Sequence, residues 1–334
     1  MDELESGEQQ SLPFGDDPDE AEPEGAGLLQ EAAEEGDSRS QYLLAQRFRY
    51  GYGGIRKNLV QARVWYESAG CNGVADAEWN ADQLARDMSA AETAKARFRI
   101  GTMYERGGPV PVNRGMAREL YREAAAAGNA GAQGALGRWH ESGMEGVQAS
   151  DIEAFAWYCV SVHSGSKSSA RERDRILKRL TKQELSAARC RLGRLYLDGD
   201  EIPLDEGEAR HWFHLAAKDA VPEAEFAMGE IHYYGLGVAE DQRKALRWLR
   251  LAAEHGCVKA QIRVGTMRLD GEGAPRDPVD GLAWLRVAAI EGSAEAERQL
   301  RRAERQMDEA QVKQVDSQVR KYLAQIDGQR SGAA

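Results

Sequence analysis

The chain has 334 residues and a formal net charge of −11, but the negative charge is concentrated at one end. Residues 1–24 hold ten acidic residues and no Lys or Arg, so the remainder, with 44 basic and 45 acidic residues, is nearly neutral. No stretch approaches the ~20 apolar residues that a membrane-spanning helix needs, and the acidic start lacks the basic and apolar regions of a secretory signal. We therefore expect a cytoplasmic protein that does not associate with a membrane.

The first 26 residues form an acidic segment with few large apolar side chains, which are Leu4, Leu12 and Phe14. Such a composition cannot compensate for the entropy lost on ordering, so residues 1–26 are predicted to be a disordered tail. Two interpretations of this tail remain open. It can be a solubilising segment, or it can be an interaction or autoinhibitory arm.

Residues 27–293 contain a helix-pair pattern of about 36 residues that recurs six times, which is typical of a solenoid. Five copies have a Gly near the end of the first helix, a small residue sixteen or seventeen positions later, and a large apolar residue three positions after that. The glycines are Gly101, Gly137, Gly193, Gly229 and Gly265. The large residues are Leu120, Trp157, Trp212, Trp248 and Trp284, and a degenerate first copy adds Trp65.

The ends of the second helices are also marked. A residue of a type common at helix N-caps precedes each second helix. Its side-chain oxygen can accept a hydrogen bond from a free backbone N–H in the first turn. These residues are Asn58, Asn113, Ser150, Asp205, Asp241 and Asp277. A Gly follows five of the helices, where a left-handed residue is needed. These are Gly73, Gly128, Gly165, Gly256 and Gly292; in the remaining copy Ala220 stands instead, and Pro222 is expected to stop the helix.

A second layer of the pattern predicts inserted elements. Capping-box sequences begin at Ser89, Thr181 and Asp308, each twenty-four residues after a Trp of the repeat. We therefore expect an extra helix pair at each of these places. The distances from Ala62 to Ala154 and from Ala117 to Ala209 are both 92 residues, which indicates that a larger block is duplicated. Residues 294–326 are predicted to be polar capping helices, and residues 327–334 to be disordered.

These columns resemble the Sel1-like repeat family, a branch of the tetratricopeptide-like α/α solenoids. The resemblance covers about residues 40–295 and is closest in residues 224–238 and 241–256. It implies an all-α, right-handed superhelical solenoid of about six helix-pair repeats with extra inserted helices. It also implies a bacterial scaffold that binds other proteins. Secreted members carry regular cysteine pairs within repeats, whereas Cys71, Cys159, Cys190 and Cys257 are not arranged so, which favours reduced thiols in the cytoplasm.

Arginine recurs on the first helices. We count from the anchoring position of each first helix, which holds Gly in five of the six copies. The positions two before and one after it share a face, and one or both hold Arg in five of the six repeats. The residues are Arg47, Arg99, Arg138, Arg191, Arg194 and Arg263. In tetratricopeptide-like solenoids the first helices line the concave groove, so we predict an arginine-lined groove that binds an acidic or phosphorylated segment of a protein partner. The alternative is that Arg is simply a good residue for an exposed helix.

Other kinds of chemistry have weaker support. His211 and His214 share a helix face, but no Cys or carboxylate completes a metal-ligand set, so ordinary histidines are favoured. The segment 167–194 is basic, yet it lacks aromatic residues for base stacking, so a solvated helix face is favoured over nucleic-acid binding. The glycine doublets match no phosphate-binding motif. We predict a non-enzymatic adaptor without cofactor or metal. A regulatory inhibitor acting through the acidic tail is the second interpretation, and a metal-dependent role of the two histidines is the third.

Overall fold

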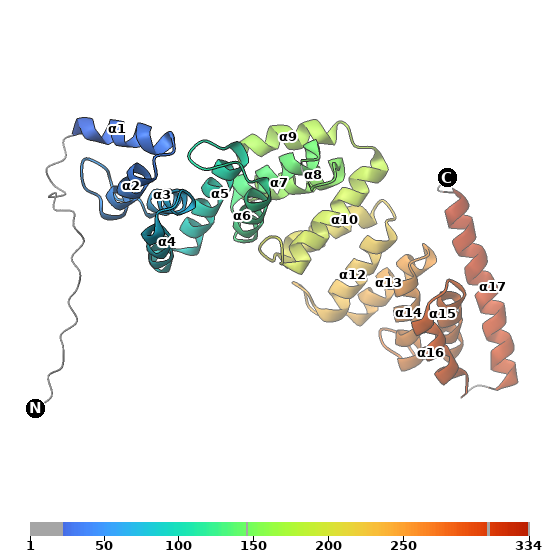
Figure 1. Cartoon of the computed structure of the whole chain (residues 1–334). Coiled ribbons are helices and arrows are strands. Elements are labelled where there is room, and N and C mark those ends of the chain that lie inside the picture. Colours follow the sequence, from blue (N-terminus) through green and yellow to red (C-terminus); the bar gives the residue numbers. More distant parts are fainter. Residues whose placement is uncertain (1–22, 145, 306–307, 333–334) are drawn as a thin grey trace, which may run out of the picture. The chain divides into compact units, whose positions relative to one another are not determined.

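The structure is a computed structural model that describes residues 23–144, 146–305 and 308–332. Within these ranges it consists of seventeen α-helices without a strand, which confirms the predicted all-α repeat fold (Figure 1). The chain divides into two compact units, Met1–Ala124 and Ala125–Ala334. Most of the predicted acidic tail, residues 1–22, lies outside the described residues. The helix α1 (Pro23–Glu34) begins before the end that was predicted for that tail.

Twelve of the helices form the six predicted pairs. The first helices are α2 (Ser38–Tyr50), α5 (Ala90–Arg106), α7 (Ala130–Ser142), α10 (Lys182–Asp198), α12 (Pro222–Tyr234) and α14 (Val258–Asp270). The second helices are α3 (Leu59–Cys71), α6 (Arg114–Ala126), α8 (Asp151–His163), α11 (Glu206–Ala217), α13 (Gln242–Glu254) and α15 (Pro278–Ile290). The others are α1, α4 (Ala75–Asp87), α9 (Lys167–Leu177), α16 (Ala294–Glu304) and α17 (Glu309–Gly332).

Each pair closes around one small residue of its first helix, which we call the central residue. It lies six positions before the Gly that follows the helix. The central residues are Ala45, Gly101, Gly137, Gly193, Gly229 and Gly265. A Cβ atom added to Gly229 would lie 2.5 Å from the Leu249 side chain, and one added to Gly193 would lie 2.7 Å from the Phe213 ring. The second helix therefore approaches as closely as glycine permits.

The residue that meets the central glycine is the one directly after the predicted large apolar column. It is buried in every pair, and the set is Tyr66, Tyr121, Tyr158, Phe213, Leu249 and Leu285. In the predicted column itself, Trp284 is fully buried, whereas Trp212 and Trp248 are only half-buried. The most prominent column in the sequence is thus adjacent to the contact that closes the pair.

The six predicted N-cap residues link the two helices of their pairs. Each side chain accepts a hydrogen bond from the backbone N–H three residues later, as predicted. Each backbone N–H also donates to the carbonyl three residues after the central residue. Asn58 N, for example, lies 2.7 Å from Phe48 O, and Asp241 N lies 2.8 Å from His232 O. One residue therefore both starts the second helix and binds it to the first.

The two internal insertions differ from the prediction, because each is a single helix, α4 or α9, rather than a helix pair. After the last pair two helices follow, α16 and α17. The capping boxes of Ser89 with Glu92 and Thr181 with Glu184 are confirmed. They begin α5 and α10, which are the first helices of the next repeats, lengthened to 17 residues where α7 has 13. Asp308 and Gln311 exchange the same bonds at the start of α17.

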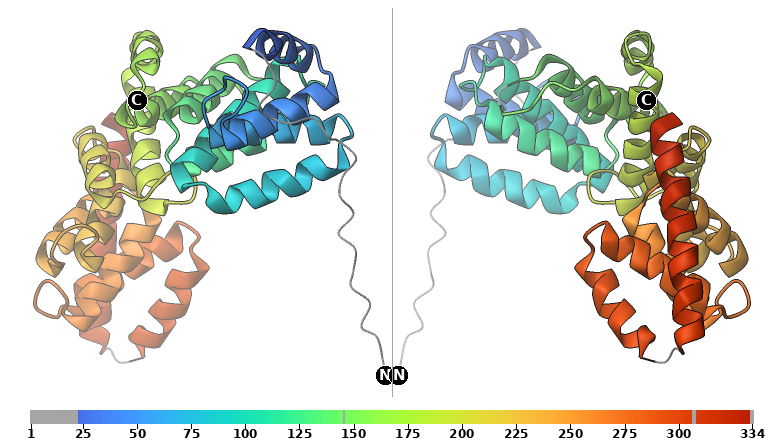
Figure 2. Two further views of the ribbon diagram at one scale, coloured as in Figure 1. Left: turned by 90° about the vertical axis from the view of Figure 1, so that its left-hand side faces the viewer. Right: turned by 90° about the vertical axis from the view of Figure 1, so that its right-hand side faces the viewer.

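The helix α17 lies along α15 and ends the stack of helix pairs (Figure 2). Its buried residues Val315, Val319, Tyr322 and Ile326 pack on the core of the last two pairs, where the Tyr322 ring stacks on Trp284 at 4.0 Å. The helix continues beyond the buried Ile326 through residues 327–332, which were predicted to be disordered. Residues 333–334 lie outside the described part.

The end of α11 also differs from the prediction. Ala220 itself adopts a left-handed backbone with φ of 57°, as Gly256 does with φ of 86° at the equivalent position of the next repeat. Pro222 does not stop α11, because it is the first residue of α12. At this position a backbone N–H would have no partner within the helix, so proline is tolerated. Ala220 therefore carries backbone strain that a glycine would avoid.

Replacing Ala220 should consequently stabilise the protein. We expect Ala220→Gly to raise the free energy of unfolding by about 0.5–1 kcal/mol, because relief of left-handed strain exceeds the added chain entropy. Gly256→Ala at the equivalent position should lower it by a similar amount. Urea denaturation followed by circular dichroism measures both changes, and a stability loss in Ala220→Gly would contradict the strain.

The contact at the central residue gives a second prediction. Gly229→Ala should destabilise the protein by about 1–3 kcal/mol, although alanine is the better helix former, because its methyl group overlaps Leu249. The control is Gly115→Ala in α6, where the nearest atom would lie 3.5 Å away and no loss is expected. Thermal unfolding of the two variants distinguishes overlap from propensity. Equal melting temperatures for both would show that the pair can relax around a methyl group.

Candidate functional site

Five of the six predicted arginines occupy equivalent positions on the first helices, and Arg47 does not. We call the positions two before and one after the central residue the first-helix face. In the first unit these positions hold Leu43 and Gln46 on α2, and Arg99 and Thr102 on α5. In the second unit they hold Ala135 and Arg138 on α7, Arg191 and Arg194 on α10, Ala227 and Glu230 on α12, and Arg263 and Thr266 on α14.

The structure places Arg47 outside this face. With Ala45 as the central residue, Arg47 lies two positions after it, and its guanidinium lies against the loop that follows α2. A Cβ atom on Gly53 would be 3.3 Å from the guanidinium carbon of Arg47. The first pair has no central glycine, so its register could not be read from the sequence. Arg47 therefore belongs to a loop contact of its own repeat.

Two of the remaining arginines are held by carboxylates. Arg191 Nε lies 2.9 Å from Glu153 Oε1 on α8, and its Nη2 lies 2.7 Å from Glu201 Oε1 in the following loop. Arg263 Nη2 on α14 lies 3.1 Å from Glu230 Oε2 on α12. These ion pairs keep the pKa of both guanidinium groups above the usual range despite their burial. Arg191 and Arg263 therefore connect neighbouring helices, with part of their charge already neutralised.

Arg194, Arg138 and Arg99 are placed differently. Arg194 and Arg138 extend from the exposed sides of α10 and α7, whereas Arg99 is half-buried on α5. Arg194 lies beside Cys190, and the structure shows no ion pair for it among the described residues. The full charge of this guanidinium is thus available at the surface. In the second unit the first-helix face carries both structural and accessible arginines.

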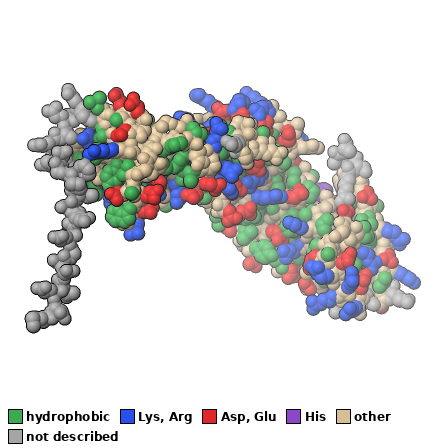
Figure 3. Space-filling model, viewed as in Figure 1, with side chains coloured by type: hydrophobic (Ala, Val, Ile, Leu, Met, Phe, Trp, Pro, Cys, Tyr) green, Lys and Arg blue, Asp and Glu red, His purple; other side chains and the backbone are tan. Residues whose placement is uncertain are grey.

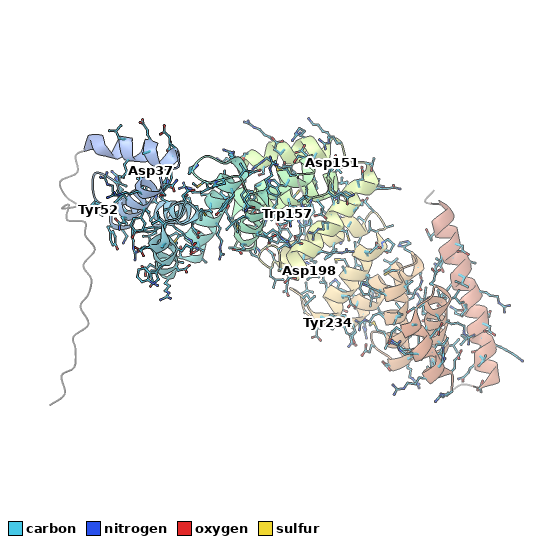
Figure 4. The ribbon with its side chains drawn as sticks, viewed as in Figure 1. Asp37, Tyr52, Asp151, Trp157, Asp198 and Tyr234 are labelled. Carbon is cyan, nitrogen blue, oxygen red and sulfur yellow. The ribbon has the colours of Figure 1, made fainter. Side chains whose placement is uncertain are left out.

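Two tyrosines join this face at Arg263 and were not predicted from the sequence. The guanidinium carbon of Arg263 lies 5.1 Å from the ring centre of Tyr233 and 5.7 Å from that of Tyr234. Its Nη2 donates to the Tyr234 hydroxyl at 3.0 Å, at the end of α12 (Figure 4). Tyr234 remains half exposed. An aromatic pair at one helix end is the only sequence signal for this group, and one repeat alone carries it.

The basic segment that includes α9 uses much of its charge within the second unit. Lys and Arg side chains gather over α9 in the space-filling view (Figure 3). Arg175 pairs with Glu141 at 2.7 Å, and Arg179 pairs with both Glu141 and Asp151. These ion pairs tie α9 to α7 and α8.

The two histidines of the H-x-x-H pattern contact tryptophans. The His211 ring lies 5.4 Å from Trp212, and the His214 ring lies 6.1 Å from Trp248. Among the described residues, no group of three or more His, Cys, Asp or Glu side chains could hold a metal ion. Desolvation lowers the pKa of His214, and the neighbouring cationic groups lower it further. None of the four cysteines forms a disulfide, and Cys159 and Cys190 are buried, as core residues of their helices would be.

Membrane-spanning elements are not found in the part of the chain that the structure describes: no helix there combines the necessary length and apolar character.

The arrangement of repeats agrees with known proteins. The family described as Sel1 repeat matches residues 38–74, 94–129, 130–162, 186–220, 222–257 and 258–293, which together exceed half of the chain. Chitin synthase regulatory factor 3 of Schizosaccharomyces pombe is 26% identical over 204 residues, which are 60% of this chain and 18% of that protein. The chain thus spans about a fifth of that relative.

Two solved structures are also similar. The first is c5321, a protective antigen of uropathogenic Escherichia coli with an SLR fold. It has a TM-score of 0.40 and 24% identity, and the similarity covers 91% of this chain and 72% of that one. The second is a Sel1 repeat protein from Oxalobacter formigenes, with a TM-score of 0.32 and 22% identity, which covers 80% of this chain and 96% of that one.

The different surroundings of Arg191 and Arg194 predict different effects of mutation. Arg191→Met should lower the free energy of unfolding by about 1–2 kcal/mol, because Glu153 and Glu201 would lose a charged donor. Arg194→Met should change it by less than about 0.5 kcal/mol. Urea denaturation of the two variants provides the comparison. Equal destabilisation would show that Arg194 has a structural role as well.

Proposed function

Because the chain belongs to the Sel1 repeat family, we propose that it is a non-enzymatic cytoplasmic adaptor that binds a segment of a protein partner on its first-helix face. Proteins of this family generally mediate protein–protein interactions, and they are typically non-catalytic scaffolds. A stack of helix pairs offers a long surface of repeated positions to an extended segment. The adaptor role thus needs no catalytic group.

One observation carries the assignment of the surface, namely the accessible charge of Arg194 beside the carboxylate-held Arg191 on α10. Arginine pairs with carboxylate and phosphate oxygens through two parallel N–H bonds, so an acidic or phosphorylated segment fits this face. Arg138 on α7 and Arg263 on α14 extend the same positions to neighbouring repeats. Arg99 would have the same role in the first unit. The Tyr233 and Tyr234 rings add residue types that often dominate binding energy.

A capture experiment with charge-reversal variants tests this function. The full chain, immobilised, is exposed to native lysate at moderate salt, and captured proteins are identified by mass spectrometry. Arg138→Glu with Arg194→Glu should reduce capture of a specific partner at least tenfold, because like charges replace attraction. The control is Arg298→Glu with Arg301→Glu on α16, where both arginines are highly exposed, pair with glutamates of their own helix, and do not occupy positions of the first-helix face. Equal capture by all three proteins would exclude the proposed face.

The acidic residues 1–24 favour a second role, which is regulation by competition for the same face. A tethered acidic segment has a high effective concentration near a basic surface, so it can act as a weak pseudo-ligand. Deleting residues 1–22, which precede α1, should then tighten partner binding and reduce its dependence on salt. Binding isotherms at two salt concentrations measure both effects. Unchanged affinity after the deletion would leave the tail with a solubilising role only.

A further inference from the structure

The sequence contains two blocks related by a shift of 92 residues, and in the second block a cavity lies among α8, α9, α10 and α11. A space of about 360 Å³ is lined by residues that include Phe155, Tyr196, Glu208 and Trp212. A smaller space of about 110 Å³ adjoins it and is lined by residues that include Gln133 and Ser164. Tyr196 and His163 line both spaces. The cavity reaches the surface at His163 and Ser164, which are exposed.

Two polar side chains that line this cavity, Tyr196 and Gln133, have an oxygen without a hydrogen bond among the described residues. Tyr196 is only 4% exposed, and its hydroxyl has no hydrogen-bond partner among the described residues. Gln133 is fully buried; its Nε2 donates to Ala125 O, but its Oε1 has no partner in the part of the chain that the structure describes. Buried polar groups in proteins are nearly always paired, so the buried and unpaired Gln133 Oε1 at this cavity indicates a ligand with hydrogen-bond donors.

The first block shows how the same positions are satisfied without a ligand. Each residue 92 positions earlier is its counterpart, so Gln133 corresponds to Gln41 and Tyr196 to Tyr104. Asn72 Nδ2 donates to Gln41 Oε1 at 2.9 Å, and the Tyr104 hydroxyl lies 2.6 Å from the sulfur of Cys71. The counterpart of Asn72 is Ser164, whose side chain is too short to reach in the same way. The counterpart of Cys71 is His163, whose ring meets the edge of Tyr196.

The walls of the larger space have also diverged. The first block has an ion pair between Arg63 and Glu67 where the second block has Phe155 and Cys159. Met116 and Leu120 are replaced by Glu208 and Trp212. The second block has thus gained aromatic surfaces and a carboxylate at the cavity. Aromatic faces next to a carboxylate attract a cation.

The charges around the cavity agree with a cationic ligand. Glu208 accepts one hydrogen bond, from Trp212 Nε1 at 3.1 Å. Arg173 also lines the larger space, but its Nε and Nη2 both donate to Asp174, at 2.9 Å and 2.8 Å, so its charge is largely compensated. Burial and the negative charges of Glu208 and Asp205 raise the pKa of Tyr196, so the phenol stays protonated beside them.

We propose that this cavity binds an arginine side chain of a protein partner. The guanidinium would stack on the Trp212 or Phe155 ring, pair with Glu208, and donate to Gln133 Oε1 and the Tyr196 oxygen. A planar group with five donors matches this combination of flat walls and acceptors. The inference rests on the proposed function in one respect, namely that the bound arginine side chain belongs to a partner protein. It adds one basic residue to a partner segment that is otherwise acidic.

The test is a titration of the full chain with N-acetyl-arginine amide, followed by NMR, beside the neutral isostere N-acetyl-citrulline amide. We expect saturable binding of the arginine derivative and at least tenfold weaker binding of the citrulline derivative. Tyr196→Phe and Glu208→Gln should each weaken arginine binding by about five- to tenfold. The matched control in the first block, Tyr104→Phe, should leave it unchanged.

Ser164→Asn provides an independent variant, because it restores the residue of the first block. We expect it to satisfy Gln133, raise the melting temperature, and abolish binding of N-acetyl-arginine amide. Absence of saturable binding, equal binding of the two derivatives, or binding unaffected by Tyr196→Phe and Glu208→Gln would overturn the proposal. Arginine binding without capture of any partner protein would support the cavity while contradicting the adaptor function.

Discussion

The contact between the central residue of a first helix and the side chain that covers it determines most of this structure. Because a Cβ atom at Gly193 or Gly229 would overlap Phe213 or Leu249, the two helices can meet only where the first helix has almost no side chain. That closest approach fixes the turn between the helices. The backbone N–H of the N-cap residue then donates to the carbonyl three positions after the central residue. The remaining surface positions are free to vary, which is how one scaffold can carry different sites.

The parts of the fold that depend on local chemistry could be predicted from the sequence. The glycines, the N-caps and the capping boxes each satisfy a requirement of their own helix, so their patterns are visible without a partner. The register of the first pair was not predictable, because Ala45 fills the central position without a distinctive signal. The single inserted helices were expected as pairs for a related reason: α5 and α10 start like inserted helices but continue into the next repeat.

The arginine face was predicted less well than the fold, because the state of an arginine depends on its neighbours in space. Arg191 and Arg194 are three residues apart, yet only Arg191 lies near Glu153, which is 38 positions earlier in the chain. No periodicity distinguishes a charge that is paired from one that remains accessible. The cavity beside α9 is harder still to predict, since its character depends on the absence of an amide at Ser164, which only the first block reveals.

The end of the stack has a consequence for assembly. The capping boxes place the glycines of α5 and α10 twelve positions after Ser89 and Thr181, and the same count from Asp308 in α17 reaches Arg320, which is exposed. A second copy that added a helix there would have to bury this guanidinium without a designed partner, at a considerable cost in desolvation. Head-to-tail addition of repeat proteins can otherwise continue without closing, and it then produces open-ended filaments. A single arginine in place of glycine thus disfavours such polymerisation through α17.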